Sequence, residues 1–143
     1  PFDLFSGMAT NPQPDAPPAE RRLALRVMTR PQDTNHYGTI FGGVILSAID
    51  QAGFVEARHS GSHRWVTASI ERVDFLAPVL VGDVVNLYAC TVRQGTKSVT
   101  IRVDVEAERY HNSEIVPVTS ATMTMVAVDA KGTPIPFRSA PTI

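Results

Sequence analysis

The chain has 143 residues, of which 43% are hydrophobic, and its 13 basic and 14 acidic side chains give a formal net charge of -1 at pH 7. This length suits a single domain, and the balanced charge excludes the broad positive field that binds a nucleic-acid backbone. The single cysteine, Cys90, excludes an intramolecular disulfide, and no apolar run approaches the roughly 20 residues that span a bilayer. We therefore expect a cytoplasmic protein without nucleic-acid or membrane partners.

The N-terminal region is expected to lie outside the folded domain. Residues 1–7 precede the pair Gly7-Met8, a pattern typical of an expression scar before a natural initiator methionine. Residues 11–18 contain four prolines and almost no large apolar side chain, a composition that predicts an extended or disordered leader. The expected division is a scar and leader over residues 1–20, one domain over 21–133 and an extended C-terminal tail over 134–143.

Hydrophobic periodicity predicts a short strand and then one helix. The strand is indicated by three apolar residues that alternate with other residue types before the break at Arg30-Pro31, namely Leu23, Leu25 and Val27. From Gly42 to about His59 the sequence has few polar positions over about four or five turns, which predicts a mostly buried helix.

Long strands follow the helix. After Gly61 an alternating run changes phase between Ile70 and Val73, which predicts a β-bulge near Glu71-Arg72. Three later strands are expected to face inward through apolar residues at every second position. These residues are Val85, Leu87 and Ala89 in the first, Val99, Ile101, Val103, Val105 and Ala107 in the second, and Ala121, Met123, Met125 and Ala127 in the last, which runs from about Val118 to Val128.

The order of these elements indicates the fold class. One early helix followed by consecutive long strands predicts an α+β fold in which an antiparallel sheet curls around the helix. Strands of about ten residues exceed the common five or six, as wrapping a helix requires. A parallel doubly wound sheet is not expected, because strands and helices do not alternate and the glycine fingerprints of dinucleotide and P-loop folds are absent.

The segment from Asp33 to Asp50 joins a polar loop to the predicted helix and contains the residues most suited to chemistry. Gly42 and Gly43 lie where the helix begins, so their backbone N–H groups are unpaired donors at the positive end of its dipole. Such donors could stabilise a carbonyl oxygen that gains negative charge. An ordinary helix-entry turn would explain the same two glycines.

Asp50 is an ionisable residue in a mostly apolar helix. Gly43, Ser47, Asp50 and Phe54 follow one another at spacings of four, three and four residues, so they share one helix face. A carboxylate on this face could carry out chemistry, or it could simply face solvent or a subunit boundary. The local pattern leaves both interpretations open.

The same segment is similar to a known family. Asp33-Thr34-Asn35, Gly38, Ile40-Phe41-Gly42-Gly43 and Asp50 resemble the signature of bacterial hotdog-fold acyl-CoA thioesterases of the cytosolic acyl-CoA hydrolase type. Further similar segments are Phe75-Leu76-Ala77-Pro78, Val81-Gly82-Asp83-Val84-Val85, Gly95-Thr96-Lys97-Ser98 and Val126-Ala127-Val128-Asp129. The resemblance extends over residues 22–130.

The resemblance implies a hotdog fold, in which a long antiparallel sheet wraps around one central helix. It also implies an enzyme that hydrolyses acyl-CoA. No cofactor is expected, since CoA is part of the substrate. The resemblance further implies a homodimer, commonly assembled further into a hexamer as a trimer of dimers, with active sites between subunits. Asp50 would be the catalytic carboxylate and Asn35 a second catalytic residue, while the amides of Gly42 and Gly43 would polarise the thioester carbonyl. His36 and Tyr37 receive no role.

Substrate contacts are expected in two places. The resemblance raises Thr96, Lys97 and Ser98 as candidate contacts for CoA, with Arg93 and Arg102 nearby. Basic side chains at a turn can equally be solvated and bind nothing. Phe54 and Phe75 are candidates for the acyl pocket, but the sequence does not indicate which acyl chains would fit.

The expected chemistry needs few groups. Hydrolysis of a thioester releases a thiolate, whose conjugate acid has a pKa of about 8.5, so neither a strong general acid nor a histidine-centred triad is required. An aspartate, ordinarily ionised at neutral pH, could activate water as a general base or attack the carbonyl to give a mixed anhydride. The sequence leaves both routes open.

Other reactive residue types fit packing better than chemistry. Ser47 lacks the Gly-x-Ser-x-Gly elbow and is interpreted as a helix serine that bonds backwards or lines the cleft. Cys90 lies within an alternating strand and is interpreted as a packing residue. His59 and His63 have the spacing of helical metal ligands, but Gly61 interrupts the helix and no third ligand is evident, so no metal is expected.

Two other functions compete with hydrolysis. An acyl-CoA-binding sensor would use the same fold without turnover, although the presence of Asp50 and the lack of an added DNA-binding segment argue against it. A hotdog hydratase or dehydratase would need a catalytic arrangement of Asp and His that the helix region lacks. Release of free thiol from acyl-CoA distinguishes the hydrolase from both alternatives.

Overall fold

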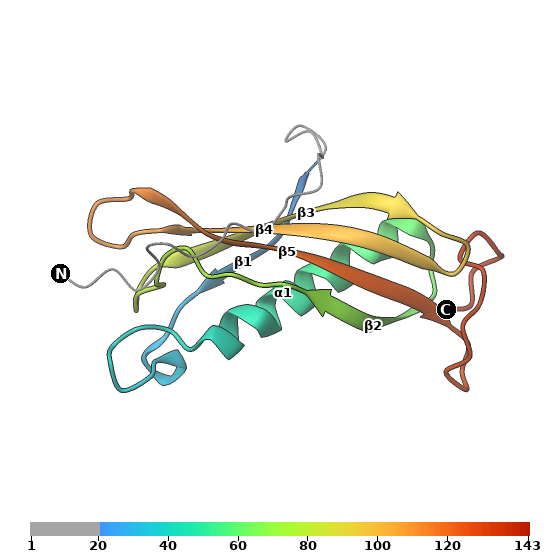
Figure 1. Ribbon diagram of the computed structural model, residues 1–143, viewed down its shortest axis with the longest axis horizontal. Coiled ribbons are helices and arrows are strands. Elements are labelled where there is room, and N and C mark those ends of the chain that lie inside the picture. Colours follow the sequence, from blue (N-terminus) through green and yellow to red (C-terminus); the bar gives the residue numbers. More distant parts are fainter. Residues whose placement is uncertain (1–20) are drawn as a thin grey trace.

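The structure is a computed structural model that describes residues 21–143, so the expected scar and leader lie outside the described residues. One α-helix, α1 (Gly42–Ala57), accompanies five strands in a single antiparallel sheet with the order β1-β3-β4-β5-β2. The strands are β1 (Arg22–Met28), β2 (Arg64–Glu71), β3 (Val84–Gln94), β4 (Ser98–Glu108) and β5 (Ile115–Val128). Figure 1 shows the long strands curving over α1, so the predicted α+β class is confirmed.

The core lies between α1 and the sheet because the central strands present alternate apolar side chains to the helix. Every inward-facing residue predicted for β3, β4 and β5 is buried. The residues between them along β4 are only partly covered, as expected for a sheet with one dry face and one wet face.

The helix begins at Gly42 as predicted, and a short 3-10 turn, Arg58–Ser60, extends it beyond Ala57. Its sheet-facing side packs closely at Gly53, where an added Cβ would lie 2.1 Å from Met123 Sδ. The opposite side is open, because the ring of Phe54 is 43% exposed. The helix is therefore buried along one side only, and the expectation of a mostly buried helix was too broad. No helix in residues 21–143 is long and apolar enough to cross a membrane.

One detail of the strands differs from the sequence-based expectations. The irregularity in β2 lies between Thr67 and Ser69, and the strand ends at Glu71, so the predicted bulge near Glu71-Arg72 was wrong. Arg72 instead has a φ of 38° and turns the chain out of the sheet. The change of hydrophobic phase at this point marks the end of a strand, which local periodicity alone cannot distinguish from a bulge.

The three alternating apolar residues of β1 are not covered alike, because Leu23 is exposed whereas Leu25 and Val27 are partly buried. The register between β1 and β3 shifts between Leu23 and Leu25, which turns Leu23 away from the helix. β1 is instead fastened to α1 by an ion pair, in which Arg22 Nη2 donates to Glu56 Oε1 at 2.7 Å. Periodicity gave no sign of this pair, because Glu56 belongs to a helix face that is otherwise apolar.

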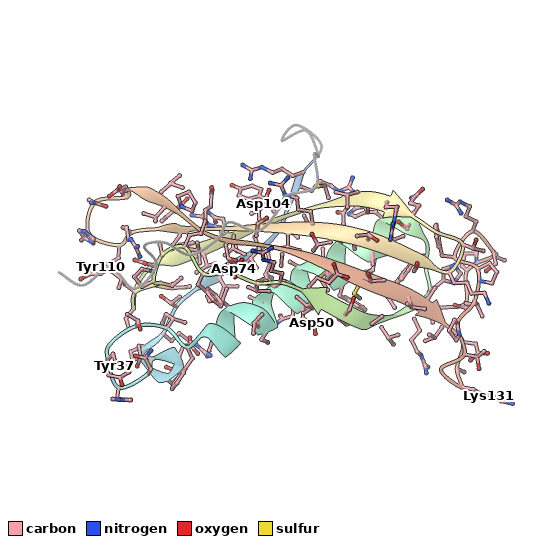
Figure 2. All side chains as sticks on the ribbon, in the orientation of Figure 1. Tyr37, Asp50, Asp74, Asp104, Tyr110 and Lys131 are labelled. Atoms are coloured by element: carbon pink, nitrogen blue, oxygen red, sulfur yellow. The ribbon has the colours of Figure 1, made fainter. Side chains whose placement is uncertain are left out.

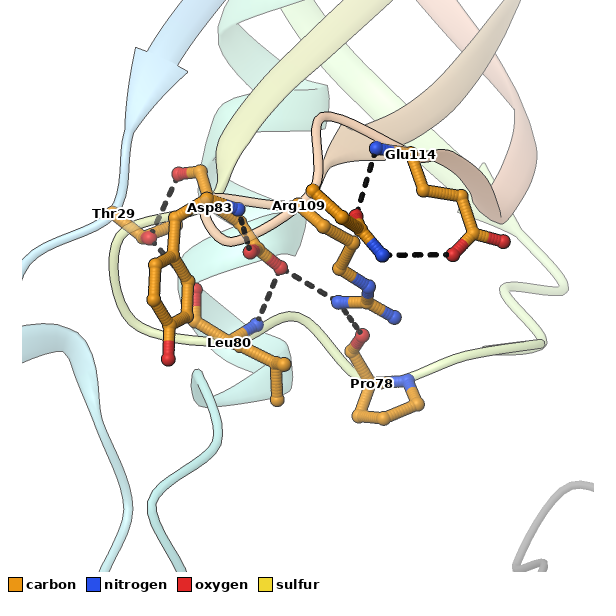
Figure 3. A network of polar contacts seen from close by, with 8 residues as sticks. Thr29, Pro78, Leu80, Asp83, Arg109 and Glu114 are labelled. Carbon is orange, nitrogen blue, oxygen red and sulfur yellow. Dashed lines mark hydrogen bonds and ion pairs between the residues drawn. The ribbon is translucent and has the colours of Figure 1, made fainter.

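A polar network holds the segment between β2 and β3 (Figure 3). Asp83 is fully buried, and its carboxylate accepts hydrogen bonds from Leu80 N at 2.9 Å, Tyr110 N at 3.2 Å and Arg109 Nη1 at 2.6 Å. Arg109 also donates to Pro78 O at 2.9 Å. The network therefore ties the segment that carries Phe75 and Pro78 to the hairpin between β4 and β5.

Residues 134–143 return along the end of the sheet. Phe137 is buried against Trp65, with ring centroids 5.9 Å apart, and its backbone N donates to Thr96 O at 3.1 Å. The ring nitrogens of buried His63 lie 2.7 Å from Phe137 O and 3.0 Å from Thr142 Oγ1. These contacts fix the C-terminal residues beside the turn between β3 and β4 and give His63 a structural role.

Candidate active site

The loop of residues 33–41 is a closed turn that leads into α1. Two backbone hydrogen bonds close it, from Phe41 N to Asp33 O at 3.0 Å and from Asn35 N to Thr39 O at 2.8 Å. Gly38 lies at its tip with a φ of 88°, a conformation that glycine adopts without steric cost. The loop is therefore an ordered unit that sets the direction in which α1 begins.

Asp33 anchors this loop to the preceding 3-10 turn, Pro31–Asp33. Its carboxylate accepts hydrogen bonds from Arg30 N at 3.0 Å and from Arg30 Nε and Nη2 at 3.2 Å each. The side-chain hydrogen bond from Arg30 is the main cause that lowers the pKa of Asp33 below its ordinary value. Asp33 therefore has a structural role at the base of the loop.

Asn35 forms hydrogen bonds within the loop. Its Oδ1 accepts from Tyr37 N at 2.9 Å and Thr39 N at 3.2 Å, and its Nδ2 donates to Thr39 Oγ1 at 2.8 Å. This is an Asx-type turn, which fixes the amide at the loop end of the molecule. Asp50 lies away from it, because eight helical residues carry the chain about 12 Å from Gly42 to Asp50. Figure 2 shows this separation between labelled Tyr37 and Asp50.

Gly42 and Gly43 are the first residues of α1, and their N–H groups have no acceptor within the helix. The preceding residue, Phe41, forms no side-chain cap. Among residues 21–143, no atom lies within 4 Å of a Cβ added to Gly43, whereas one added to Gly42 would lie 3.5 Å from the ring of Phe75. The helix start therefore has open space at Gly43 and an aromatic wall at Gly42.

Two hollows flank this helix start. The larger, of about 420 Å³, is lined by Gly43, Ser47 and Gln51 and by residues of β1 and β3. Ser47 lines this hollow, as one interpretation of it predicted, and its Oγ accepts a hydrogen bond from Gln51 Nε2 at 3.4 Å. The smaller hollow, of about 200 Å³, is bounded by Gly42 and Phe75.

Asp50 lies midway along α1, on the side facing β2. Its Oδ1 accepts a hydrogen bond from the hydroxyl of Thr67, which also lies 3.4 Å from Met125 Sδ. Within residues 21–143, no basic side chain forms an ion pair with Asp50. The carboxylate is therefore oriented by one hydroxyl and keeps other lone pairs for water or a ligand.

The helix face predicted from spacing is the open face of α1. Gly43, Ser47 and Phe54 are exposed, and Asp50 is partly exposed among them. An exposed aromatic ring and a carboxylate four residues apart lie on neighbouring turns of one helix face. This face offers both an apolar contact and an acid–base group to a bound molecule.

Thr96, Lys97 and Ser98 lie far from the loop of residues 33–41. They form the turn between β3 and β4, at the opposite end of the sheet (Figure 1). The turn is closed by a hydrogen bond from Gly95 N to Ser98 O at 2.8 Å. Within one chain, the candidate residues therefore occupy three places: the loop end, the middle of α1 and the far turn.

Thr67 orients Asp50, although no pattern in the sequence points to it. The two residues are 17 positions apart, and their contact depends on how β2 lies beside α1. A threonine in an alternating strand carries no sign of such a partner.

Comparisons with known proteins agree with this architecture. A family model described as the thioesterase superfamily matches residues 37–112. The acyl-CoA thioester hydrolase YciA of Escherichia coli (strain K12) is 41% identical over 115 residues, which cover 78% of this chain and 87% of that protein.

Two solved structures are also similar. The hexameric thioesterase y2039 from Yersinia pestis has 38% sequence identity and a TM-score of 0.78, covering 83% of this chain and 97% of that chain. The hexameric hotdog-fold thioesterase Cj0915 of Campylobacter jejuni has 39% identity and a TM-score of 0.77, covering 80% of this chain and 89% of that chain.

Proposed function

The chain belongs to the thioesterase superfamily and has the hotdog fold, and on this premise we propose that it hydrolyses acyl-CoA to a free carboxylic acid and CoA. The observation that carries the proposal is the carboxylate of Asp50. It lies on the open face of α1, is oriented by the hydroxyl of Thr67 and forms no ion pair within residues 21–143. The similarity of the chain to relatives described as acyl-CoA thioester hydrolases supports acyl-CoA as the substrate class.

Two routes use Asp50 for the same overall reaction. As a general base, Asp50 takes a proton from water while the oxygen attacks the thioester carbonyl carbon, and the tetrahedral intermediate then expels the CoA thiolate. As a nucleophile, Asp50 attacks that carbon itself, releases the thiolate and forms a mixed anhydride that water hydrolyses. Both routes place negative charge on the former carbonyl oxygen.

The start of α1 in a second copy is suited to stabilise that charge, because Gly42 and Asp50 of one chain lie about 12 Å apart along the helix. The N–H groups of Gly42 and Gly43 lack acceptors within the helix, and the helix dipole adds positive potential at this end. Open space at Gly43 would admit a carbonyl oxygen close to the backbone. The wall formed by Phe75 and the exposed ring of Phe54 are then available to an acyl chain.

Asn35 and Asp50 lie apart within one chain, so we propose that the site is completed by a second copy. β2 is an edge strand whose residues 65–70 carry no charge and no proline, which leaves its outer backbone groups ready to pair. Pairing along this edge would bring the loop of residues 33–41 of one copy toward the helix of the other. The hexameric state of similar thioesterases supports a further trimer of dimers.

A thiol-release assay tests the proposed function. The protein is mixed with acyl-CoA of short, long, branched and aromatic chains, and free CoA is measured by its reaction with a disulfide reagent. Turnover should be abolished in Asp50→Ala and strongly reduced in Asp50→Asn, with folding and oligomeric state unchanged. Saturable binding of acyl-CoA without thiol release would instead identify a sensor, and Asp50→Ala with wild-type turnover would refute the assignment of Asp50.

Rapid-quench mass spectrometry of the reacting enzyme distinguishes the two routes. A nucleophilic Asp50 gives a transient protein species heavier by the acyl group, located on the peptide that contains Asp50. A general base gives no acylated protein at any quench time, although CoA is released in the same period.

A further inference from the structure

The basic side chains of the molecule fall into two groups. All 13 lie within residues 21–143, and seven of them form ion pairs with carboxylates. The seven paired residues are Arg21, Arg22, Arg26, Arg30, Arg72, Arg102 and Arg109. The other six form no ion pair in this part of the chain, and they are Arg58, Arg64, Arg93, Lys97, Lys131 and Arg138.

The six unpaired cations gather at one end of the molecule, which we call the basic end and define as residues 58–64, 91–98 and 129–143. Figure 1 shows the end of α1, the turn between β3 and β4 and the C-terminal residues at this end. Backbone hydrogen bonds join its parts, because Phe137 N donates to Thr96 O and Thr142 N donates to Ser62 O. All six cations are exposed.

Little negative charge offsets them. The three segments of the basic end contain a single acidic side chain, Asp129, whose Oδ1 accepts hydrogen bonds from Lys131 N and Thr133 N at 2.9 Å each. Asp129 is thus used to shape its own turn. A chain with a net charge of -1 therefore has a strongly positive end, which is the field that attracts an anion carrying several charges.

Among the six cations of this end, Arg138 forms the most side-chain contacts with residues 21–143. Its Nη1 donates to Gly95 O at 3.0 Å and its Nη2 to Gln94 Oε1 at 3.3 Å, and its guanidinium lies 4.5 Å from the centroid of the Phe137 ring. Since Phe137 is buried, the guanidinium is held beside the turn that carries Lys97. An arginine has five N–H donors, so several remain free in a planar group that suits phosphate oxygens.

We propose that Arg138 is a specificity-determining residue for thioesters that carry the CoA nucleotide, because its guanidinium is held beside the turn of Thr96, Lys97 and Ser98 with N–H donors left for a phosphate group. This inference rests on the proposed hydrolysis of acyl-CoA and adds a residue from outside the turn of Thr96, Lys97 and Ser98. CoA separates its phosphates from its thioester by the long pantetheine arm. The eight residues from Asp50 to Arg58 span about 12 Å along α1, which provides such a separation.

The arrangement explains why these cations have no carboxylate partners. An arginine already paired with a carboxylate must give up that contact before it can bind a phosphate, whereas an unpaired one exchanges only water. Arg138 is also held in place in advance, which lowers the entropy lost when a phosphate binds. Acyl chains linked to pantetheine alone lack the phosphates and gain nothing from this end.

The test compares two substrates with the same acyl group, acyl-CoA and S-acyl-pantetheine, using the acyl chain that gives the fastest turnover. In Arg138→Gln, KM for acyl-CoA should rise about tenfold, the change expected for loss of one charge-assisted contact, while kcat stays the same. The kcat/KM for S-acyl-pantetheine should not change. Higher ionic strength should raise KM for acyl-CoA alone. In Arg138→Lys, which keeps the positive charge, KM for acyl-CoA should rise less than in Arg138→Gln.

Arg26→Gln is the matched control, because it removes one positive charge from a cation that is already paired with Glu108. It should leave KM for both substrates unchanged. Parallel losses on both substrates in Arg138→Gln would show that Arg138 only stabilises the turn, and no change on either would place the phosphates elsewhere. If the wild type hydrolyses neither substrate, the proposed function fails. Calorimetry then still tests the role of Arg138, because CoA should bind more weakly to Arg138→Gln than to the wild type, and equal affinities would refute it.

Discussion

Asp50 and Asp83 differ in burial and in the number of hydrogen-bond donors around their carboxylates. Asp83 is fully buried and receives two backbone N–H groups and the guanidinium of Arg109. Asp50 is partly exposed, and among residues 21–143 only the hydroxyl of Thr67 donates to it. One carboxylate has its hydrogen-bonding capacity filled by the chain, and the other keeps capacity for a molecule from outside.

This difference separates carboxylates that hold the fold from one suited to chemistry. A buried carboxylate with three donors cannot approach a substrate, and its removal leaves those donors and a cation without a partner. A partly exposed carboxylate with one donor contributes little to folding but can accept a proton or attack a carbonyl. Substitutions should therefore damage stability at Asp83 and turnover at Asp50.

The largest expected effect on stability comes from Asp83→Asn. Loss of the charge leaves Arg109 unpaired in the closed network, so the free energy of unfolding should fall by about 3–5 kcal/mol. Urea unfolding followed by circular dichroism measures this change. Asp74→Asn is the matched control, because its ion pair with Arg72 is more exposed and should contribute less than about 1 kcal/mol. Equal losses in both variants would contradict a special role for the Asp83 network.

Gly53→Ala and Gly43→Ala compare the packed face of α1 with its open face. The new methyl group would overlap the side chain of buried Met123, so we expect a net loss of about 1–2 kcal/mol even after the gain in helix propensity. Gly43→Ala, on the open face, meets nothing within 4 Å and should not lower stability. Thermal unfolding of the two variants checks this. A stable Gly53→Ala variant would mean that Met123 moves aside without cost.

Thr67→Val tests how Asp50 is oriented. The substitution keeps the shape of the side chain and removes its hydroxyl, so kcat should fall about tenfold through loss of one aligning hydrogen bond, equivalent to about 1.4 kcal/mol. KM and the melting temperature should change little, because Thr67 is exposed. Thr67→Ser should restore most of the activity. Failure of Thr67→Ser to recover activity would mean that the methyl group, and not the hydroxyl, supports turnover.

The smallest effect concerns pH. Hydrogen bonds from Arg30 lower the pKa of Asp33, and hydrogen bonds from Asn86 and then Arg26 lower the pKa of Glu108. A carboxyl whose pKa is lowered in the folded state stabilises the fold at every pH above its unfolded pKa, which is about 4. This stabilisation is lost as the pH falls through the folded pKa. The melting temperature should therefore fall below about pH 4. Asp33→Asn should make this fall shallower, and an unchanged slope would refute the contribution of Asp33.

Much of the fold could be predicted because burial leaves a simple pattern. The alternation in β4 predicted every inward residue, since one face of that strand is dry. The first residue of α1 was also predicted, because Gly42 and Gly43 separate a polar loop from an apolar run. The bulge in β2 and the exposure of Leu23 could not be predicted, because both depend on the register with a neighbouring strand.

The candidate site could be predicted only in part. The spacing of Gly43, Ser47, Asp50 and Phe54 predicted a shared face, and the structure confirms it. The hydrogen bond from Thr67 to Asp50 joins residues far apart in the sequence, and no local pattern encodes it. The basic end could not be predicted either, because its cations come from three separate segments and the net charge of the whole chain is only -1.

We propose that Asp50 performs the hydrolysis and contributes little to the stability of the fold. The most direct test is the rate of CoA release by Asp50→Asn, measured at saturating acyl-CoA on protein whose melting temperature and oligomeric state match the wild type. We predict that kcat falls at least about 100-fold while the melting temperature stays the same. A kcat close to that of the wild type in such a folded sample would contradict the account.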